Sequence, residues 1–299
     1  MTTILLSGST GQVGTELRNT LAPVGRVIAL DRSRMDLTRA DTIRKAIRDA
    51  RPEIIVNAAG FTTVDKVEAE PDLAMQVNGI APGIMAEEAK RAGAILVHYS
   101  TDYVFDGELE RLYVEEDAPN PVNVYGRTKL AGERAIEAVG GAYLILRTSW
   151  VYSDHGTNFV RTILRLARER HELSVVTDQT GSPSWARALA AATADLLRYK
   201  DRIPGNSGIY HLSAAGHTTR YEFTRAIIRT MQELTGIPGG WASVKPIVSA
   251  GYLLPAKRPR RPATSKDKIK QVFGIEMPGW EAQLRACLRE ITNGTRKSA

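Results

Sequence analysis

The side chains in this sequence best suited to chemistry are a tyrosine and a lysine four positions apart, Tyr125 and Lys129. In a helix, positions i and i+4 lie on the same face, so the phenol and the ammonium would be neighbours. A free phenol has a pKa of about 10, and a nearby positive charge favours the phenolate, which moves the group toward acid–base work at neutral pH. The pair therefore predicts proton transfer, with Lys129 tuning Tyr125.

The spacing of Tyr125 and Lys129 alone can arise by chance, but the position of the pair in the chain supports a catalytic role. Tyr125 and Lys129 lie on an expected helix between two strand-like runs, 95–100 and 143–148, and the first run ends just before Thr101. In open parallel sheets, ligands bind outside the carboxyl ends of the strands. We therefore expect the Thr101 hydroxyl to face the same crevice, and these three residues are the catalytic candidates.

A glycine-rich turn is the candidate binding site for a dinucleotide cofactor. The segment Gly8-Ser-Thr-Gly11-Gln-Val-Gly14 directly follows an apolar run at 3–7 and opens a helical pattern that ends near Leu21. Glycines permit a tight turn and close approach of a diphosphate to backbone N–H groups, and the helix N-terminus adds a partial positive charge. The cofactor candidates in this turn are Gly8, Thr10, Gly11, Gln12, Val13 and Gly14.

The sequence leaves the choice between NADPH and NADH open. Asp31 ends the second apolar run about 20 residues after the turn, where a carboxylate can accept hydrogen bonds from the adenine ribose, which favours NAD. Arg32 and Arg34 follow at once and could pair with a 2′-phosphate, which favours NADP. Together with Tyr125 and Lys129, the remaining cofactor candidates are Asp31, Arg32, Asp36, Leu37, Ala58, Ala59 and Gly60.

The elements that must position these residues alternate through the first half of the chain. Further strand-like runs occur at 26–31 and 53–57, and 41–50 has the apolar spacing of an amphipathic helix with Asp41 as its N-cap. Such alternation predicts a parallel sheet, and runs that are apolar nearly throughout are typical of strands covered by helices on both faces. The expected fold class is α/β, with a Rossmann-like doubly wound parallel sheet.

The second half is less regular and predicts a smaller C-terminal α/β unit. Its expected elements are helices at 157–170 and 184–199, a strand at 208–213, and a helix opened by the capping box Thr219-x-x-Glu222. We expect an NAD(P)-binding Rossmann domain over 1–149, rejoined by about 186–213. Residues 150–299 are expected to form mainly the substrate-binding domain.

Composition narrows the classes of partner. The net charge is +7, but 40 basic and 33 acidic residues are interspersed, so nucleic acid is not expected, whereas a basic surface suits a diphosphate ligand. No run approaches the roughly 18–20 apolar residues that span a bilayer, and no signal peptide is expected. The single cysteine, Cys287, excludes an intramolecular disulfide, and we expect a cytoplasmic protein. The five histidines lack metal-ligand spacing, so we expect no metal site.

These segments resemble the extended short-chain dehydrogenase/reductase superfamily and, within it, the dTDP-4-dehydrorhamnose reductase family. The likeness runs over most of the chain. It is carried by the glycine turn and by residues 57–66, 100–107, 123–133, 147–152 and 178–183. Segment 100–107 discriminates best, because dehydratases of the wider superfamily carry an acidic residue directly after the Thr-Asp pair. Tyr103 stands there in this chain, which points away from dehydration.

The resemblance implies reduction of the 4-keto group of dTDP-4-dehydro-L-rhamnose to dTDP-L-rhamnose by NADPH or NADH. It implies that Thr101 polarises the carbonyl, that Tyr125 protonates the nascent alkoxide, and that Lys129 orients the nicotinamide ribose. The candidates for holding the dTDP-sugar are Thr101, Asp102, Tyr103, Trp150, Asn158, Trp185 and Arg258. A homodimer is the oligomer we consider.

Two departures from the family pattern leave the substrate open. Gly60 and Phe61 stand where the family usually has Ala and Tyr, and the stretch Arg258-Pro-Arg-Arg-Pro262 lacks the usual Ser. The alternatives are another sugar-nucleotide 4-ketoreductase, an epimerase or dehydratase on the same scaffold, and a non-catalytic NAD(P)-binding regulatory subunit. The intact Thr101, Tyr125 and Lys129 argue against the last of these.

Overall fold

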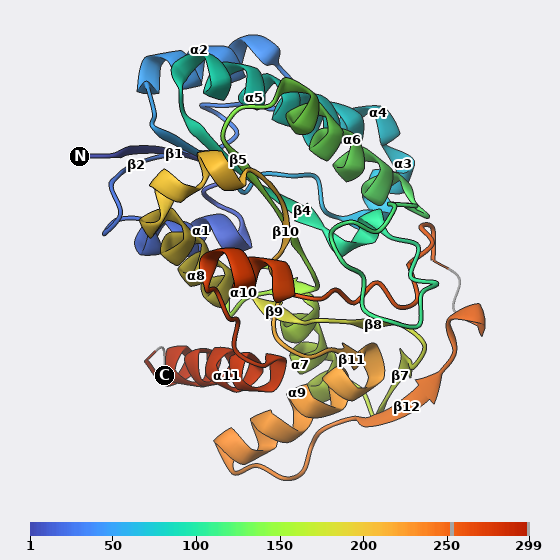
Figure 1. Cartoon of the computed structure of the whole chain (residues 1–299). Helices are drawn as coiled ribbons and strands as arrows, with labels where there is room; N and C mark the ends of the chain where they lie inside the picture. The colour runs from blue at the N-terminus through green and yellow to red at the C-terminus, as the bar shows by residue number, and fades with distance from the viewer. Residues whose placement is uncertain (252–253, 298–299) are drawn as a thin grey trace.

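The computed structural model describes residues 1–251 and 254–297, and at its centre lies a six-stranded sheet (Figure 1). The strands are β1 (Thr3–Ser7), β2 (Arg26–Leu30), β3 (Ile54–Asn57), β4 (Ile95–Thr101), β5 (Tyr143–Thr148) and β10 (Gly208–His211). Their order is β10-β5-β4-β3-β1-β2, and every neighbouring pair is parallel, as predicted. Because β2 and β3 lie on opposite sides of β1, the chain reverses direction across the sheet there, and such reversals are where ligands bind.

Helices cover both faces of this sheet (Figure 1). One face carries α2 (Ala40–Ala50), α5 (Ala81–Ala92) and α6 (Val124–Val139), and the other carries α1 (Gln12–Thr20), α8 (Ala186–Arg198) and α10 (Asp267–Phe273). Successive strand side chains point to opposite faces. Leu5 packs with Ile43 and Met85 on the first face, whereas its neighbour Ile4 packs with Leu17 on the second. Burial on both faces explains why the strand sequences are apolar at most positions.

Three short helical segments connect β3 to α5. They are α3 (Val64–Ala69), α4 (Pro71–Ala74) and the π-helical turn η1 (Met75–Ile80). Short 3-10 turns occur at η2 (Asp102–Val104), η3 (Lys200–Arg202), η4 (Pro204–Asn206) and η5 (Ser249–Gly251). None of the helices in the described part of the chain has the length and apolar content that crossing a membrane requires.

A second, smaller unit lies beside the sheet, in the lower part of Figure 1. Its helices are α7 (Phe159–Glu169), α9 (Arg220–Thr235) and α11 (Trp280–Lys297). Its strands form three short pairs: β6 (Val151–Tyr152) with β9 (Ser184–Trp185), β7 (Glu172–Val176) with β12 (Ser243–Ile247), and β8 (Thr180–Gly181) with β11 (Thr218–Thr219). Phe223, Leu284 and the free Cys287 are buried in its core.

The chain passes between the two units more than once. After entering the smaller unit at β6, it returns to the sheet, where α8 packs against α1 and β10 pairs with β5. It then leaves again into α9. The crevice described below is consequently bordered by segments that are far apart in sequence.

Two expectations about helix starts have different outcomes. The Thr219 hydroxyl accepts a hydrogen bond from the Glu222 N–H at 3.0 Å, so the N-cap predicted there is confirmed. The prediction that Asp41 caps its helix is wrong, because α2 begins at Ala40 and its N-cap is Arg39. Asp41 instead lies in the first turn and pairs with the Arg39 guanidinium at 2.8 Å.

Candidate active site

Two adjoining cavities run along the carboxyl ends of the central strands. One, of about 470 Å³, extends from the glycine turn to Asp31, and the other, of about 540 Å³, extends from the turn to Thr101, Tyr125 and Lys129. The two cavities share Gly11 and residues 58–60 in their walls. They are therefore two ends of one elongated crevice at the point where the sheet order reverses, with the shape that an extended dinucleotide requires.

The glycine turn is built for close backbone approach. Gly8 has a φ of +71°, and a Cβ there would lie 2.5 Å from the Ala59 nitrogen. No side chain caps the N-terminus of α1. The buried Oε1 of Gln12 has no hydrogen-bond partner among the described residues. The uncapped helix N–H groups fit the diphosphate of a dinucleotide. The Gln12 oxygen can accept a hydrogen bond from a hydroxyl or N–H group of a ligand in the crevice.

Gly14 has a different task from the other residues of the turn, because it lines neither cavity. A Cβ on Gly14 would lie 2.0 Å from the carbonyl oxygen of Gly8. Its missing side chain lets α1 pack against the turn, which is the packing task of the third glycine in such motifs. All the other cofactor candidates line one or both cavities.

Gly14→Ala is expected to destabilise the protein by about 1–3 kcal/mol, because the backbone must move to accept the methyl group. Urea denaturation followed by circular dichroism measures this change. Gly205→Ala is the matched control, since no atom lies within 4 Å of a Cβ there, and we expect a change within about 0.5 kcal/mol. Equal stability of Gly14→Ala and the unaltered protein would contradict this packing.

The end of the crevice near β2 carries features suited to either dinucleotide. Asp31 Oδ1 accepts hydrogen bonds from the Ser33 hydroxyl at 2.6 Å and from the backbone N–H groups of Ser33 and Arg34. These bonds hold the pKa of the Asp31 carboxyl below its usual value, so it is an ionised acceptor. The Arg32 side chain is 78% exposed and lies 3.7 Å from Asp36, which leaves it accessible to a phosphate.

The phenol of Tyr125 lies in the other end of the crevice, at the start of α6. Asn123 caps this helix by accepting a hydrogen bond from the Gly126 N–H at 2.8 Å. Burial raises the pKa of the Tyr125 phenol, and a hydrogen bond with Thr101 offsets only part of the rise. We expected a neighbouring ammonium to bring this pKa toward neutrality, but burial is the larger effect. The phenol is therefore protonated at neutral pH, the form that a proton donor needs.

Lys129 lies one helical turn farther along α6 and is 3% exposed. Its Nζ is 2.5 Å from the carbonyl oxygen of Tyr99 and 3.0 Å from His98 Nε2. Burial lowers the pKa of the Lys129 ammonium to about 8, although the Glu133 carboxylate opposes the change. Lys129 is thus a buried lysine whose charge is sensitive to its surroundings.

Thr101 and Asp102 close the sheet side of the same cavity. The Thr101 hydroxyl accepts a hydrogen bond from the Tyr103 N–H at 3.1 Å and donates to Asp102 at 3.2 Å. Burial raises the pKa of the Asp102 carboxyl to about 6, while a hydrogen bond from the Ser149 hydroxyl partly offsets the rise. The structure therefore brings Thr101, Tyr125 and Lys129 into one cavity wall, as the strand-end argument predicted.

The candidates for substrate binding divide into two groups. Thr101, Asp102, Tyr103, Trp150 and Asn158 line the cavity of about 540 Å³. Asn158 also caps α7 by accepting from the Arg161 N–H at 3.1 Å.

Trp185 and Arg258 line neither end of the crevice. Trp185 is buried in the core of the smaller unit. Arg258 makes a two-pronged ion pair with Asp65, with both N···O distances 2.7 Å. The basic residues around Arg258 in the sequence gave no sign that Asp65 is its partner. Because Trp185 and Arg258 line neither cavity, their contact with a substrate stays a prediction.

The sequence gave no reason to select Arg220 or Thr148, which also line the cavity. The Arg220 guanidinium lies 3.5 Å from the centre of the Trp150 ring, and Trp150 itself has a φ of +44°. Thr148 Oγ1 is buried without a hydrogen-bond partner among the described residues. A positive φ strains the backbone of a tryptophan, and strained residues of this kind are common at functional sites. These side chains extend the cavity wall toward the smaller unit.

Asn78 is a further residue that the sequence did not indicate, and its hydrogen bonds connect two segments that border the crevice. It lies in the π-helical turn η1 and is 1% exposed. Its side chain forms two hydrogen bonds of 2.9 Å with the backbone of Phe61 and one of 3.3 Å with the Thr128 hydroxyl. Asn78 thereby joins the loop after β3 to the helix that carries Tyr125 and Lys129.

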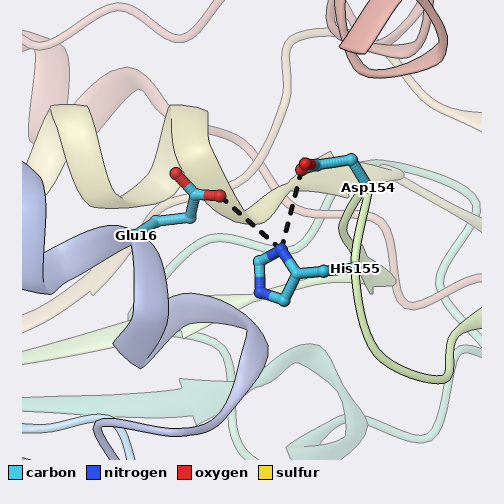
Figure 2. Close-up of side chains that lie close together, drawn as sticks. All are labelled: Glu16, Asp154 and His155. Carbon is cyan, nitrogen blue, oxygen red and sulfur yellow. Dashed lines mark ion pairs between the residues drawn. The ribbon is translucent and has the colours of Figure 1, made fainter. Parts of the chain in front are cut away.

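Figure 2 shows a group of two acidic side chains and a histidine. None of the three lines either cavity of the crevice. Glu16, Asp154 and His155 bring their ligand atoms within 4.8 Å of one another, and His155 Nδ1 is 3.8 Å from Glu16 and 3.7 Å from Asp154. The Arg187 guanidinium already pairs with Glu16 at 3.0 Å and lies 3.8 Å from Asp154. A cation therefore already balances these carboxylates, and we assign no metal to the group.

Comparison with known proteins identifies the family of this chain. The family model described as "RmlD substrate binding domain" matches residues 1–293. The chain is 43% identical to dTDP-4-dehydrorhamnose reductase of Burkholderia thailandensis, over 96% of this chain and 98% of that protein. It is 41% identical to the enzyme of the same name from Escherichia coli K12, over 98% and 99%. The chain belongs to the dTDP-4-dehydrorhamnose reductase family.

Solved structures agree with this family membership, and the resemblance predicted from sequence is confirmed. A dTDP-4-dehydrorhamnose reductase from Bacillus anthracis, crystallised in complex with NADP, superposes with a TM-score of 0.88 at 32% identity and covers 97% of this chain and 99% of that one. A UDP-glucose 4-epimerase from Thermus thermophilus in complex with NAD superposes with a TM-score of 0.78 at 19% identity, covering 97% and 99%. At that identity the epimerase shows a shared fold alone.

Proposed function

We propose that this chain reduces the 4-keto group of dTDP-4-dehydro-L-rhamnose with NADPH or NADH and yields dTDP-L-rhamnose. The observation that carries the proposal is the presence of Thr101, Tyr125 and Lys129 in one wall of a cavity of about 540 Å³ that adjoins the glycine turn. The family membership supports the same reaction, because the relatives at about 40% identity are named for it.

Three residues of the cavity have separate roles in the proposed reduction. A bound dinucleotide supplies the hydride. The Thr101 hydroxyl, at the end of β4, turns its hydrogen from Asp102 to the keto oxygen and polarises it. The Tyr125 phenol, kept protonated by burial, donates its proton to the oxygen that becomes the hydroxyl. Lys129 in its charged form then stabilises the phenolate left on Tyr125.

The two units take different parts in this proposal. The central sheet with its helices, residues 1–149 rejoined by about 186–213, holds the dinucleotide, and the smaller unit within 150–299 holds most of the sugar nucleotide. Trp150 offers an aromatic face with the Arg220 guanidinium stacked on it, which suits a negatively charged nucleotide sugar. The homodimer and the cytoplasmic location stay proposals of the same kind, and light scattering of the purified protein tests the first.

An absorbance assay at 340 nm tests the proposed function. Purified protein is mixed with NADPH or NADH and dTDP-4-dehydro-L-rhamnose, and with other 4-keto sugar nucleotides for comparison. Stoichiometric oxidation of the cofactor, with dTDP-L-rhamnose as the product, is the expected result. Conversion of the sugar without net cofactor oxidation would instead establish an epimerase or dehydratase. Cofactor binding without any conversion would establish a non-catalytic subunit.

A further inference from the structure

A chain of buried polar side chains runs behind Lys129 and takes no part in the reaction steps above. Ser7 at the end of β1 donates a hydrogen bond to Asn57 Oδ1 at the end of β3, at 2.7 Å. Asn57 Nδ2 lies 2.9 Å from His98 Nδ1, and His98 Nε2 lies 3.0 Å from Lys129 Nζ. All four residues are at most 3% exposed. Three neighbouring strands thus converge on one lysine nitrogen.

The direction of the hydrogen bonds in this chain is set by a backbone group. The Ala59 N–H can only donate, and it lies 3.2 Å from Asn57 Oδ1. This contact, together with the Ser7 hydroxyl, identifies the oxygen of the Asn57 amide. The amide nitrogen must therefore face His98, and because it can only donate, His98 Nδ1 must be the acceptor.

This orientation has a consequence for Lys129. Burial lowers the pKa of the His98 imidazole well below its usual value, so His98 is neutral and carries one N–H. With Nδ1 accepting, that hydrogen lies on Nε2 and points at Lys129 Nζ. An ammonium has no lone pair to accept it, whereas an amine has one. The amine can still donate to the Tyr99 carbonyl oxygen at 2.5 Å.

We propose that His98 is a positioning residue that, oriented by Asn57, favours the uncharged amine form of Lys129 in the free protein, so that in mildly alkaline solution Lys129 takes up a proton when the dinucleotide binds. This inference rests on the proposed function, since it requires dinucleotide binding. It goes beyond that function by assigning a task to His98 and a proton to the binding step.

The other groups that face Lys129 do not reverse this assignment. Glu133, one turn along α6, has both carboxylate oxygens engaged by Arg147, at 2.6 to 3.2 Å, and accepts a further hydrogen bond from Ser100. Tyr125, one turn earlier, is a neutral phenol because burial raises its pKa. Among the described residues around Lys129, the Glu133 carboxylate favours the ammonium, but burial outweighs it and the pKa of Lys129 stays below its ordinary value.

Dinucleotide binding changes the balance, because a diphosphate and ribose hydroxyls in a buried crevice favour the ammonium. Binding therefore raises the pKa of Lys129 from its starting value of about 8. Because the charged form binds better, affinity is at its full value below this pKa and falls as the pH rises above it. At pH 8.5, Lys129 is charged in roughly a quarter of the free protein molecules. The affinity for the dinucleotide should therefore be about 4-fold below its value at pH 6.5.

Titration calorimetry with NADPH tests the inference on the unaltered protein. Measurements in buffers of different ionisation enthalpy give the number of protons taken up, which should be about 0.8 per site at pH 8.5 and near zero at pH 6.5. Binding without proton uptake at pH 8.5 would overturn the inference. Absence of NADPH binding at both pH values would instead overturn the proposed function.

His98→Gln isolates the histidine, because an amide oxygen can accept a hydrogen bond from the charged lysine. Burial still lowers the pKa of Lys129 in this variant, so it should lose part of the proton uptake at pH 8.5 and bind NADPH up to about 4-fold tighter than the unaltered protein there, with equal affinity at pH 6.5. The control is His171→Gln, because His171 is exposed, lies directly before β7 and lines neither cavity. It should behave as the unaltered protein.

The paired variants also separate His98 from Lys266, another buried lysine whose pKa burial lowers to about 8. Proton uptake that persists unchanged in His98→Gln would assign the proton to another group and overturn the inference. A variant that merely damages the fold would lose affinity equally at both pH values, and this outcome too would count against it.

Discussion

Tyr125→Phe should lower the turnover of keto-sugar reduction by about 10²- to 10⁴-fold while leaving NADPH binding within about 2-fold of the unaltered protein. Phenylalanine keeps the ring, including its edge-to-face contact with Tyr103 at 5.8 Å between ring centres. It removes only the hydroxyl that hydrogen-bonds with Thr101. Turnover is measured by NADPH absorbance and binding by calorimetry, so a lost proton donor is distinguished from a lost binding site.

Tyr143→Phe is the matched control for this variant. Tyr143 begins β5, is partly buried and lines neither cavity, so removal of its hydroxyl should leave turnover unchanged. If Tyr125→Phe retained full turnover, Tyr125 would not be the proton donor. If it lost NADPH binding as well as turnover, the hydroxyl would act in binding rather than in the chemical step.

Glu133→Ala is expected to reduce the free energy of unfolding by about 3–5 kcal/mol, a large part of the roughly 5–15 kcal/mol of a typical domain. Glu133 is fully buried and Arg147 is 2% exposed, and the guanidinium approaches the carboxylate through Nε at 3.0 Å and Nη2 at 2.6 Å. Without Glu133, the Arg147 charge is left buried without its partner. Urea denaturation followed by circular dichroism and by tryptophan fluorescence measures the change.

Glu137→Ala, one turn farther along the same helix, is the control for helix propensity and for loss of a negative charge. Glu137 is exposed, so its replacement should change stability by no more than about 0.5 kcal/mol. A loss below about 1 kcal/mol in Glu133→Ala would mean that the buried pair does not hold α6 against β4 and β5. The site would then depend on other contacts, such as those of Asn78.

Much of the fold could be predicted because its signals are local. The runs at 3–7 and 143–148 coincide with β1 and β5, since strands covered on both faces are apolar at most positions. The Asp41 cap was wrong because capping depends on where the preceding loop leads the chain. That loop is organised by Asp36, whose carboxylate accepts hydrogen bonds from the Thr38 backbone and hydroxyl.

Part of the candidate site was also accessible from the sequence. The Tyr125 and Lys129 spacing and the glycine turn are short motifs whose geometry follows from helix periodicity and from glycine backbone freedom. Because ligands bind outside the carboxyl ends of parallel strands, we could also predict that Thr101 lies beside these residues. The pKa of Tyr125 was not accessible in this way, because burial, which raises it, comes from the packing of several elements.

The sequence by itself determined the α/β class, the dinucleotide turn and the trio of Thr101, Tyr125 and Lys129. Only the tertiary structure decided that Arg258 pairs with Asp65, which is 193 residues away, and that His98 meets Lys129. The physical reason is one of range. Backbone geometry is set by neighbouring residues, whereas burial and the partners of polar groups depend on segments that meet only when the chain has folded.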